Sequence, residues 1–190
     1  MSHQRKSKIV TPKDEWGTPQ WLFDLLDQEY KFLLDPAASI ENAKGKIFIT
    51  EGSLEKDWFG MVKNTRKLGF GMMWECPARE AIFLNPPYSA GNIDRFMQKA
   101  YEESQKGAVV VCLVPSATDT RWWHNYAMKA QEIRFIKGRV RFVGYDEEGK
   151  EIRQSPTFSS CVVIFGSTTH PGMSTPYIGP TIEQPRSAKA

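Results

Sequence analysis

The stretch Ala81-Ile-Phe-Leu-Asn-Pro-Pro-Tyr88 (AIFLNPPY) decides the fold, because an apolar strand runs directly into a turn that cannot continue it. Proline has no backbone N–H, so two successive prolines end a ladder inside a sheet. Apolar residues then recur with helical spacing from Ile93 to Tyr101, and the apolar run 108–114 (AVVVCLV) follows. The sequence therefore predicts a strand, a crossing helix and a second strand, which is the repeating unit of a parallel sheet.

The same alternation of helices and strands extends on both sides of this unit. Upstream, Thr18-Pro19 predicts a helix start, because a capping hydroxyl precedes a proline at the first helical position. Further strands are predicted at 32–34, 46–50, 133–136, 140–143 and 161–165, and a further helix at 119–129. We expect the last two strands to pair antiparallel across the polar loop 145–154 (YDEEGKEIRQ), within an α/β domain whose sheet is largely parallel.

Composition predicts one domain with two loose ends. The 190 residues, 41% of them apolar, suffice for one buried core. We place the domain at 15–166, a flexible basic tail at 1–14 and a proline-rich, disordered tail at 167–190. No apolar run approaches the ~18 residues of a membrane span, and the first residues lack the apolar region of a secretory signal. A cytoplasmic location is expected.

The net charge and the cysteines exclude few classes of protein. The net charge of +3 permits a nucleic-acid partner without requiring one, because binding depends on where positive charge clusters. Cys76, Cys112 and Cys161 are odd in number and far apart, which argues against a disulfide framework or a zinc site. We expect Cys112 and Cys161 to be core residues of strands, and no metal.

Unusual polar residues follow two of the predicted strands, at Asp35 and at Asn85. Ligands of open α/β sheets bind beyond the carboxyl ends of strands, so both segments are candidate site residues. The prolines after Asn85 stiffen the turn and leave the carbonyl of Pro86 as a pure acceptor. An amide oxygen and a carbonyl can then converge on one planar amino group and concentrate its lone pair for attack. Alone, such a tetrapeptide is more often a rigid loop than a catalytic turn.

Several segments together carry a specific resemblance. They are Trp16-Gly-Thr-Pro19, Asp35-Pro-Ala-Ala-Ser-Ile-Glu-Asn-Ala43, Gly52-Ser-Leu54 with Asp57-Trp58, Asn85-Pro-Pro-Tyr88, Gly138-Arg-Val-Arg-Phe142 and Ser155-Pro-Thr-Phe-Ser-Ser160. In this order they resemble the phage and prophage DNA adenine-N6 methyltransferase family, over about residues 14 to 166. The resemblance implies a Rossmann-like class I methyltransferase fold and S-adenosyl-L-methionine as the methyl donor.

The resemblance also implies roles for individual residues. The catalytic turn is Asn85, Pro86, Pro87 and Tyr88, with Tyr88 offering a face to an adenine flipped out of the duplex. The implied cofactor-binding residues are Trp16, Thr18, Pro19, Asp35, Pro36, Ala37, Ser39, Glu51, Asp57, Trp58 and Asn85. Glu51 is a candidate for the ribose hydroxyls and Asp57 for the cofactor's adenine. As alternatives, Glu51 is a solvated loop acid, Asp57 a helix cap and Trp16 a core residue. Ala37, Ala38 and Ser39 replace the commoner glycine-rich form of the loop.

No separate recognition domain fits in the chain, so DNA contacts are expected from loops with basic and aromatic side chains. The predicted DNA-binding residues are Lys63, Arg66, Lys67, Ser116, Arg121, Trp122, Trp123, Arg139 and Arg141, with Arg79 and Arg153 nearby. We expect at least one indole of the tryptophan pair to be exposed, the alternative being that both anchor the helix. His124 is expected to be a surface residue rather than a base.

The predicted function is site-specific methylation of adenine N6 in double-stranded DNA, with neither a membrane nor an obligate protein partner. The runner-up activities are methylation of RNA adenine or of a protein glutamine amide, which present the same planar amino group. From another class, the chain could be a catalytically silent DNA-binding homologue. The intact Asn85 to Tyr88 turn argues against a silent protein.

Overall fold

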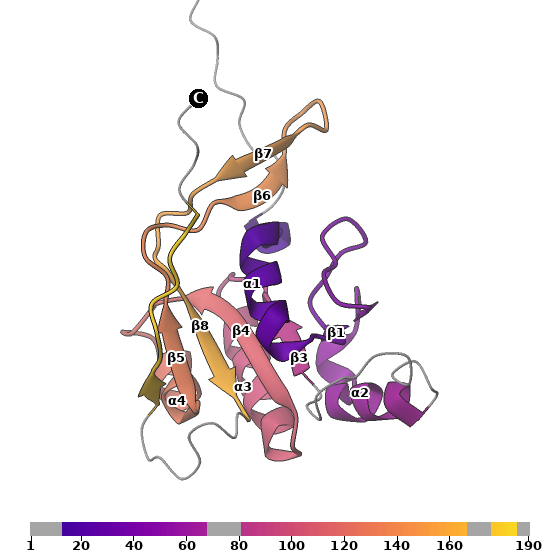
Figure 1. Ribbon diagram of the computed structural model, residues 1–190. Coiled ribbons are helices and arrows are strands. Elements are labelled where there is room, and N and C mark those ends of the chain that lie inside the picture. The colour runs from indigo at the N-terminus through magenta and orange to yellow at the C-terminus, as the bar shows by residue number, and fades with distance from the viewer. Residues whose placement is uncertain (1–12, 68–80, 167–175, 186–190) are drawn as a thin grey trace, which may run out of the picture.

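The fold is a mixed α/β sheet with helices on both faces (Figure 1). The computed structural model describes residues 13–67, 81–166 and 176–185. Its helices are η1 Lys13–Glu15, α1 Gln20–Tyr30, η2 Ser53–Glu55, α2 Trp58–Lys67, α3 Asn92–Gln105, α4 Arg121–Asn125 and η3 Ala127–Lys129. Its strands are β1 Leu34–Asp35, β2 Ile47–Phe48, β3 Ala81–Leu84, β4 Val109–Pro115, β5 Glu132–Phe135, β6 Phe142–Tyr145, β7 Glu151–Gln154, β8 Ser160–Phe165 and β9 Tyr177–Ile178.

The strand order of the main sheet is β2-β1-β3-β4-β8-β5-β9. Strands β2, β1, β3 and β4 are parallel neighbours, with Ala81 to Leu84 of β3 in register with Val109 to Cys112 of β4. Strand β8 runs antiparallel to both β4 and β5. The predicted strand, crossing helix and strand are thereby confirmed as β3, α3 and β4, in a sheet that is mostly parallel. Because β1 and β3 are parallel neighbours, their carboxyl ends lie at one edge.

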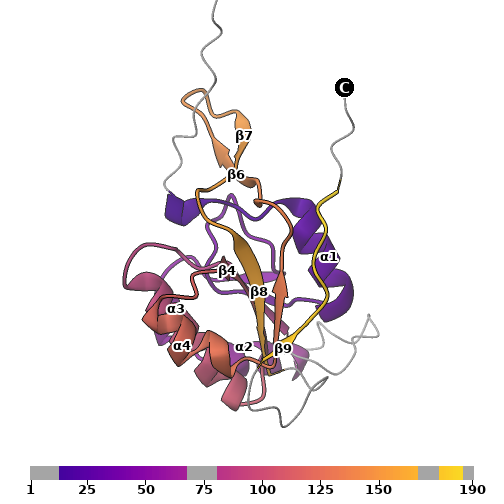
Figure 2. The same cartoon turned by 90° about the vertical axis from the view of Figure 1, so that its left-hand side faces the viewer.

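Two apolar clusters cover the two faces of this sheet. Helices α2, α3 and α4 pack on one face, where Trp58, Met97 and Trp123 are buried against alternate residues of β3 and β4. On the other face, Leu22 and Leu26 of α1 are buried against the remaining strand residues. Figure 2 shows α1 on the opposite side of the sheet from α3 and α4. The alternation of strand side chains therefore builds a three-layer core.

Strand pairing in the last third of the chain differs from the prediction. We expected 140–143 to pair with 161–165, but β6 pairs with β7, and β8 pairs with β4 and β5. The loop predicted to be irregular therefore supplies a strand of its own. The β6–β7 hairpin stands out from the body of the protein (Figure 1). An isolated bridge between Gly17 and Val143 ties its base to the segment before α1.

The predicted loose C-terminal tail also differs from the structure, in the part that the structure describes. Residues 176–185 form a segment that runs along β5, with β9 parallel to it. Ile182 is buried, and it forms an isolated bridge with Ile136. Proline-rich composition did not prevent this segment from joining the sheet, because backbone hydrogen bonds to an open strand edge need no apolar periodicity.

The start of α1 is shifted by one residue from the prediction. Pro19 is the N-cap residue, with no side-chain hydrogen bond to the helix, and the first helical residue is Gln20. The Thr18 hydroxyl is buried and makes no hydrogen bond to the described residues. In the part of the chain that the structure describes, no helix is long and apolar enough to cross a membrane.

Candidate functional site

Asn85 lies at the end of β3 with its amide orientation set by two neighbours. Its Nδ2 donates to the carbonyl oxygen of Trp16 at 3.0 Å. Its Oδ1 accepts from the Tyr88 hydroxyl at 2.6 Å. The backbone carbonyl of Trp16 therefore directs the amide oxygen of Asn85 away from the N-terminal segment, toward the turn.

The Tyr88 hydroxyl has two acceptors within reach. It lies 2.6 Å from Asn85 Oδ1 and 3.0 Å from the carbonyl oxygen of Leu113 on β4. A phenol carries one proton, so it donates to one of these oxygens at a time. Burial raises the pKa of Tyr88 well above its usual range, so the hydroxyl stays protonated. The ring makes edge contacts with Phe142 and Phe158.

Asp35 ends β1 with its carboxylate turned back onto its own loop. It accepts from the backbone N–H of Ala37 at 3.4 Å and of Lys44 at 3.1 Å. Burial raises the pKa of Asp35 to about 6, although these two backbone N–H groups and Lys44 oppose the rise. The loop returns so closely that a Cβ on Gly45 would lie 2.6 Å from the Asp35 nitrogen. The loop geometry therefore requires glycine there.

A groove of about 680 Å³ runs from this loop to the segment after β2. Its lining residues include Pro36, Ala37, Ser39, Glu51, Ser53 and Leu54, and the turn after β3 contributes Pro87. The structure thereby brings together the predicted loop, Glu51 and the predicted catalytic turn. The Ser53 hydroxyl is buried without a hydrogen-bond partner among the described residues.

A second pocket, of about 500 Å³, lies on the other side of the turn. It is lined by Trp16, Tyr88 and Phe158, together with neighbouring residues of the loop between β7 and β8. Trp16, Asp35 and Asn85 also line a narrow space that connects the loop region with the turn. The turn thus presents Pro87 to the groove and Tyr88 to the aromatic pocket, with Asn85 between them.

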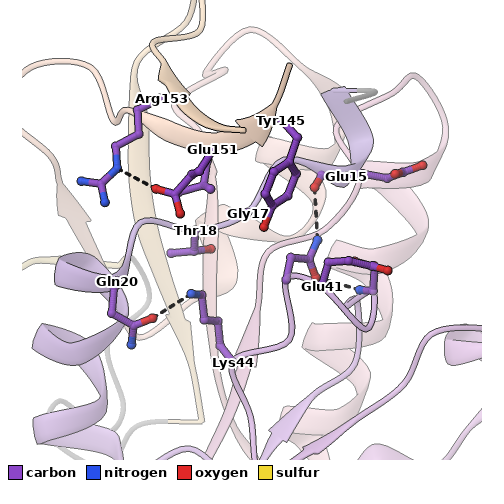
Figure 3. A pocket seen from close by; sticks show the side chains of 12 residues that line it. Glu15, Gly17, Thr18, Gln20, Glu41, Lys44, Tyr145, Glu151 and Arg153 are labelled. Carbon is purple, nitrogen blue, oxygen red and sulfur yellow. Dashed lines mark hydrogen bonds and ion pairs between the residues drawn. The ribbon is translucent and has the colours of Figure 1, made fainter. Parts of the chain in front are cut away.

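A polar pocket of about 470 Å³ lies between the β6–β7 hairpin and the start of α1 (Figure 3). Lys44 Nζ donates to Gln20 Oε1 at 2.8 Å from one side, and Arg153 pairs with Glu151 on the hairpin. Thr18 lines this pocket with its unpartnered hydroxyl. Ser39, Glu41 and Asn42 line both this pocket and the groove, so the two cavities adjoin.

Of the predicted cofactor residues, Pro36, Ala37, Ser39 and Glu51 line the groove, whereas Trp58 and Asp57 lie outside it and outside the adjoining pockets. Trp58 is completely buried, and its indole N–H donates to the carbonyl oxygen of Ser53 at 2.8 Å, so it supports the groove from beneath. Asp57 is exposed and pairs with Lys106 at 3.0 Å. The hydrogen bond from Lys106 lowers the pKa of Asp57, and the backbone N–H of Gly60 adds to this. Asp57 therefore occupies the helix-capping position that was its alternative interpretation.

The prediction that one indole of the tryptophan pair is exposed is wrong. Trp122 and Trp123 are 4% and 3% exposed, and their rings lie 5.7 Å apart within the core cluster beneath α4. Helix α4 has only five residues and packs against α3 and η3, and both indoles belong to the core cluster on this face of the sheet. The pair therefore anchors α4, and neither indole reaches a DNA surface in this structure. Arg121, one residue earlier, is exposed.

The remaining predicted DNA-binding residues are dispersed over the surface. Arg141 and Lys63 are exposed, and Lys63 Nζ lies 5.6 Å from the centre of the Phe59 ring. Ser116 follows β4, and its backbone N–H donates to Ser159. Arg139 hydrogen-bonds the carbonyl oxygen of Pro156 at 3.1 Å. The side chains of Arg66 and Lys67, and the whole of Arg79, lie outside the described residues.

Sequence reasoning missed residues whose role depends on tertiary contacts. Asn42 accepts from the Ser39 N–H at 2.7 Å and donates to the Glu15 carbonyl oxygen at 3.1 Å, so it joins the loop to the N-terminal segment. Asp14 lines the groove and the aromatic pocket and accepts from the Ser89 N–H at 2.9 Å. Phe158 lies in the motif of residues 155–160 and has no predicted role of its own, and its apolar ring between polar neighbours is the signal that could have indicated one.

Comparison with known proteins adds an independent line of observation. The model of the DNA N-6-adenine-methyltransferase (Dam) family matches residues 5–181. The chain is 30% identical over 160 residues to a DNA N-6-adenine-methyltransferase of Escherichia phage T1. The alignment covers 82% of this chain and 58% of that relative, so the chain spans little more than half of the relative's length. No solved structure matches the chain significantly. Among the described residues, no group of three His, Cys, Asp or Glu side chains could hold a metal ion.

Proposed function

The chain belongs to the DNA N-6-adenine-methyltransferase (Dam) family, and from this premise we propose that it methylates adenine N6 of double-stranded DNA with S-adenosylmethionine. One observation supports this most directly. The turn after β3 separates a polar groove from an aromatic pocket, with Pro87 on the groove side and Tyr88 on the pocket side. A donor in the groove and a base in the pocket would meet at Asn85. The parallel strands β2-β1-β3-β4 and the reversed β8 support a class I methyltransferase sheet.

The residues of the groove fit the proposed cofactor. Two buried hydroxyls have no hydrogen-bond partners among the described residues: Ser53 lines the groove at one end of the site, and Thr18 lines the adjoining polar pocket and narrow space at the other. An unpaired buried hydroxyl costs about 1–3 kcal/mol, so a polar ligand at each end would stabilise the site. We assign Thr18 and Asp35 to the amino-acid end and exposed Glu51 to the ribose. When bound, the cofactor supplies an electrophilic methyl group on a sulfonium.

The aromatic pocket suits a flipped adenine. Tyr88, Phe158 and Trp16 offer apolar faces for a planar base that has left its stack. Asn85 Oδ1 and the carbonyl oxygen of Pro86 then accept the two protons of the exocyclic amino group. When the base enters, the Tyr88 hydroxyl turns its proton from Asn85 Oδ1 to the Leu113 carbonyl oxygen, which is already within reach at 3.0 Å. This exchange frees the Asn85 acceptor without leaving a buried hydroxyl unpaired.

These acceptors activate the amino nitrogen electrostatically. Adenine N6 is a poor nucleophile because its lone pair is delocalised into the ring. Two fixed acceptors stabilise the positive charge that develops on nitrogen as it bonds to carbon, by the same logic as an oxyanion hole with reversed sign. The bound cofactor would supply the methyl group and keep the carbon–sulfur electron pair on sulfur, and the methylated nitrogen would release one proton to water. Exposed His124 is not required as a base.

Arg121 is the basic residue that we expect to contact DNA near the pocket. It is exposed at the start of α4, beyond the carboxyl end of β4. Arg121→Ala should raise the KM for DNA several-fold and reduce the salt dependence of DNA binding by about one unit of slope, because one phosphate contact is lost. Cofactor affinity and melting temperature should not change. Unchanged DNA affinity at every salt concentration would remove Arg121 from the DNA surface.

Cofactor binding should depend on pH through Asp35. Since burial raises its pKa to about 6, the negative charge that Asp35 would provide beside the amino-acid end is lost as the pH falls below that value. We expect affinity to fall about tenfold per pH unit below about pH 6 and to level off above it. Titration calorimetry of S-adenosylmethionine between about pH 5 and about pH 8 measures this. Asp35→Asn should bind more weakly with a flat profile; equal affinity of the unchanged protein across this range would contradict the assignment.

Incubation with labelled S-adenosylmethionine and separate pools of duplex DNA, RNA and protein tests the function directly. We expect label only in the DNA, recovered after digestion as N6-methyladenine. Label in RNA or on protein glutamine would favour the runner-up activities. No transfer to any pool, from protein that binds both DNA and the cofactor, would favour the silent homologue. Methylation of defined oligonucleotides then shows whether the reaction is site-specific.

A further inference from the structure

The C-terminal segment, residues 176–185, runs along β5 and ends beside the turn that precedes the hairpin. The backbone N–H of Gly179 donates to Ile133 at 2.9 Å, and that of Ile182 donates to Phe135 at 2.9 Å. The backbone N–H of Lys137 donates in return to Ile182 at 3.0 Å. The segment therefore follows β5 as far as the turn, with its pairing shifted by one residue between Ile178 and Ile182. Figure 2 shows the segment running from β9 toward the base of the hairpin.

Gln184 binds both carbonyls of that turn. Its Nε2 donates to the carbonyl oxygen of Lys137 at 2.9 Å and to that of Arg139 at 3.1 Å. Gly138 between them has φ +80°, and a Cβ there would lie 3.0 Å from Gln184 Nε2. Only a residue without a side chain combines this conformation with so close an approach. The turn at residue 138 is thus shaped around the amide of Gln184.

Arg139 connects this turn to the aromatic pocket. Its Nη1 donates to the carbonyl oxygen of Pro156 at 3.1 Å. Pro156 is buried and lines the pocket with Thr157 and Phe158. Proline has no N–H with which to fix its own loop, so its carbonyl is the backbone group there that a partner can hold. Phe158 in turn contacts the Tyr88 ring, with ring centroids 5.4 Å apart.

From these contacts we infer that Gln184 and Arg139 are positioning residues, which fix the wall of the pocket that receives the target base. Gln184 fixes the turn, the turn aims the Arg139 guanidinium, and the guanidinium fixes Pro156 and thereby Phe158. This inference rests on the proposed function, because the pocket is the proposed adenine site. It gives the C-terminal segment a part in base binding, and it gives Arg139 a role other than neutralising a phosphate.

The two roles of Arg139 make different predictions. If Arg139 contacts a phosphate, its removal should reduce the slope of DNA affinity against salt concentration by about one unit. A positioning role leaves that slope unchanged and instead lowers kcat, because a displaced Phe158 presents the base poorly to Asn85. Gln184 distinguishes the two roles further, because it is uncharged and its amide hydrogen-bonds the two carbonyls of the turn.

The experiment compares full-length Gln184→Ala and Arg139→Ala with Glu183→Gln. The control lies on the same segment and alters only an exposed pair between Lys137 and Glu183, whose side chains are 70% and 65% exposed. The readouts are kcat and KM for duplex DNA, the salt slope of DNA binding, cofactor affinity, and the fluorescence of 2-aminopurine at the target adenine. The fluorescence of 2-aminopurine reports whether the flipped base is held in the pocket.

We expect Gln184→Ala to lower kcat about fivefold, the equivalent of about one hydrogen bond, with a changed 2-aminopurine signal. Arg139→Ala should show the same pattern with an unchanged salt slope, and Glu183→Gln should match the unaltered protein. Wild-type kcat and 2-aminopurine signal in Gln184→Ala would overturn the inference, as would a lowered salt slope with normal kcat in Arg139→Ala. If the unaltered protein transfers no methyl group to DNA, the proposed function itself fails.

Discussion

Asn85→Ala is expected to lower kcat for DNA methylation by about 100- to 1000-fold, because it removes a fixed acceptor from the nitrogen that becomes positively charged. The same change also removes the Asn85 hydrogen bonds to Trp16 and Tyr88, which lie at 3.0 Å and 2.6 Å. Cofactor affinity should fall far less than kcat, because the groove is lined chiefly by other residues.

Single-turnover kinetics with saturating DNA, together with calorimetry of S-adenosylmethionine, measure the two quantities separately. Asn92→Ala is the matched control, since the amide of Asn92 donates to the nearby Ser89 hydroxyl at 2.9 Å. It should turn over at nearly the normal rate. Near-normal turnover in Asn85→Ala would rule out the proposed activation of the amino group.

The centre of the fold could be predicted from the sequence because its signals are local. The apolar run 81–84, the prolines after it and the helical spacing from Ile93 to Tyr101 each describe a segment by itself. The structure forms β3, the turn and α3 at these places. The free thiols of Cys112 and Cys161 are buried in β4 and β8, as expected of core strand residues.

The hairpin pairing could not be predicted from apolar pattern, because β7 is exposed along nearly its whole length. Its register is set by the turn instead. Asp146 Oδ1 accepts from the N–H groups of Glu148 and Lys150 at 3.1 Å and 2.9 Å. An aspartate that closes such a turn between polar residues is a recognised signal for a tight connection. The apolar residues of 140–143 predict a partner in the core, but Val140 and Phe142 are buried in the cluster on the α1 face while β6 pairs with β7.

The sequence predicted the strand-end residues of the candidate site, but it did not predict the residues that join distant segments around it. Asp35 and Asn85 both follow strands, and parallel pairing of β1 with β3 brings them to one narrow space, as their positions suggested. Asn42 and Phe158 depend on contacts between segments more than twenty residues apart, for which no local spacing exists. For the tryptophan pair the sequence predicted an exposed side chain that the structure buries. Helical spacing indicates that the two indoles point in different directions, but it does not show that the fold covers both of them.

The C-terminal segment should matter more for stability than its composition suggests. A chain that ends at Gly166 loses the backbone hydrogen bonds that residues 177–182 make with β5 and its flanking residues, as well as the burial of Ile182. Because each of these hydrogen bonds and the buried isoleucine stabilise the folded state, the shortened chain should have a lower free energy of unfolding and a lower urea midpoint. Urea unfolding followed by tryptophan fluorescence measures the change.

Two isoleucines on the segment provide a matched comparison, since Ile182 is 6% exposed and Ile178 is 56% exposed. Ile182→Ala should cost about 2 kcal/mol and Ile178→Ala well under 1 kcal/mol. Equal urea midpoints for the full and shortened chains would show that the segment does not contribute to the folded core.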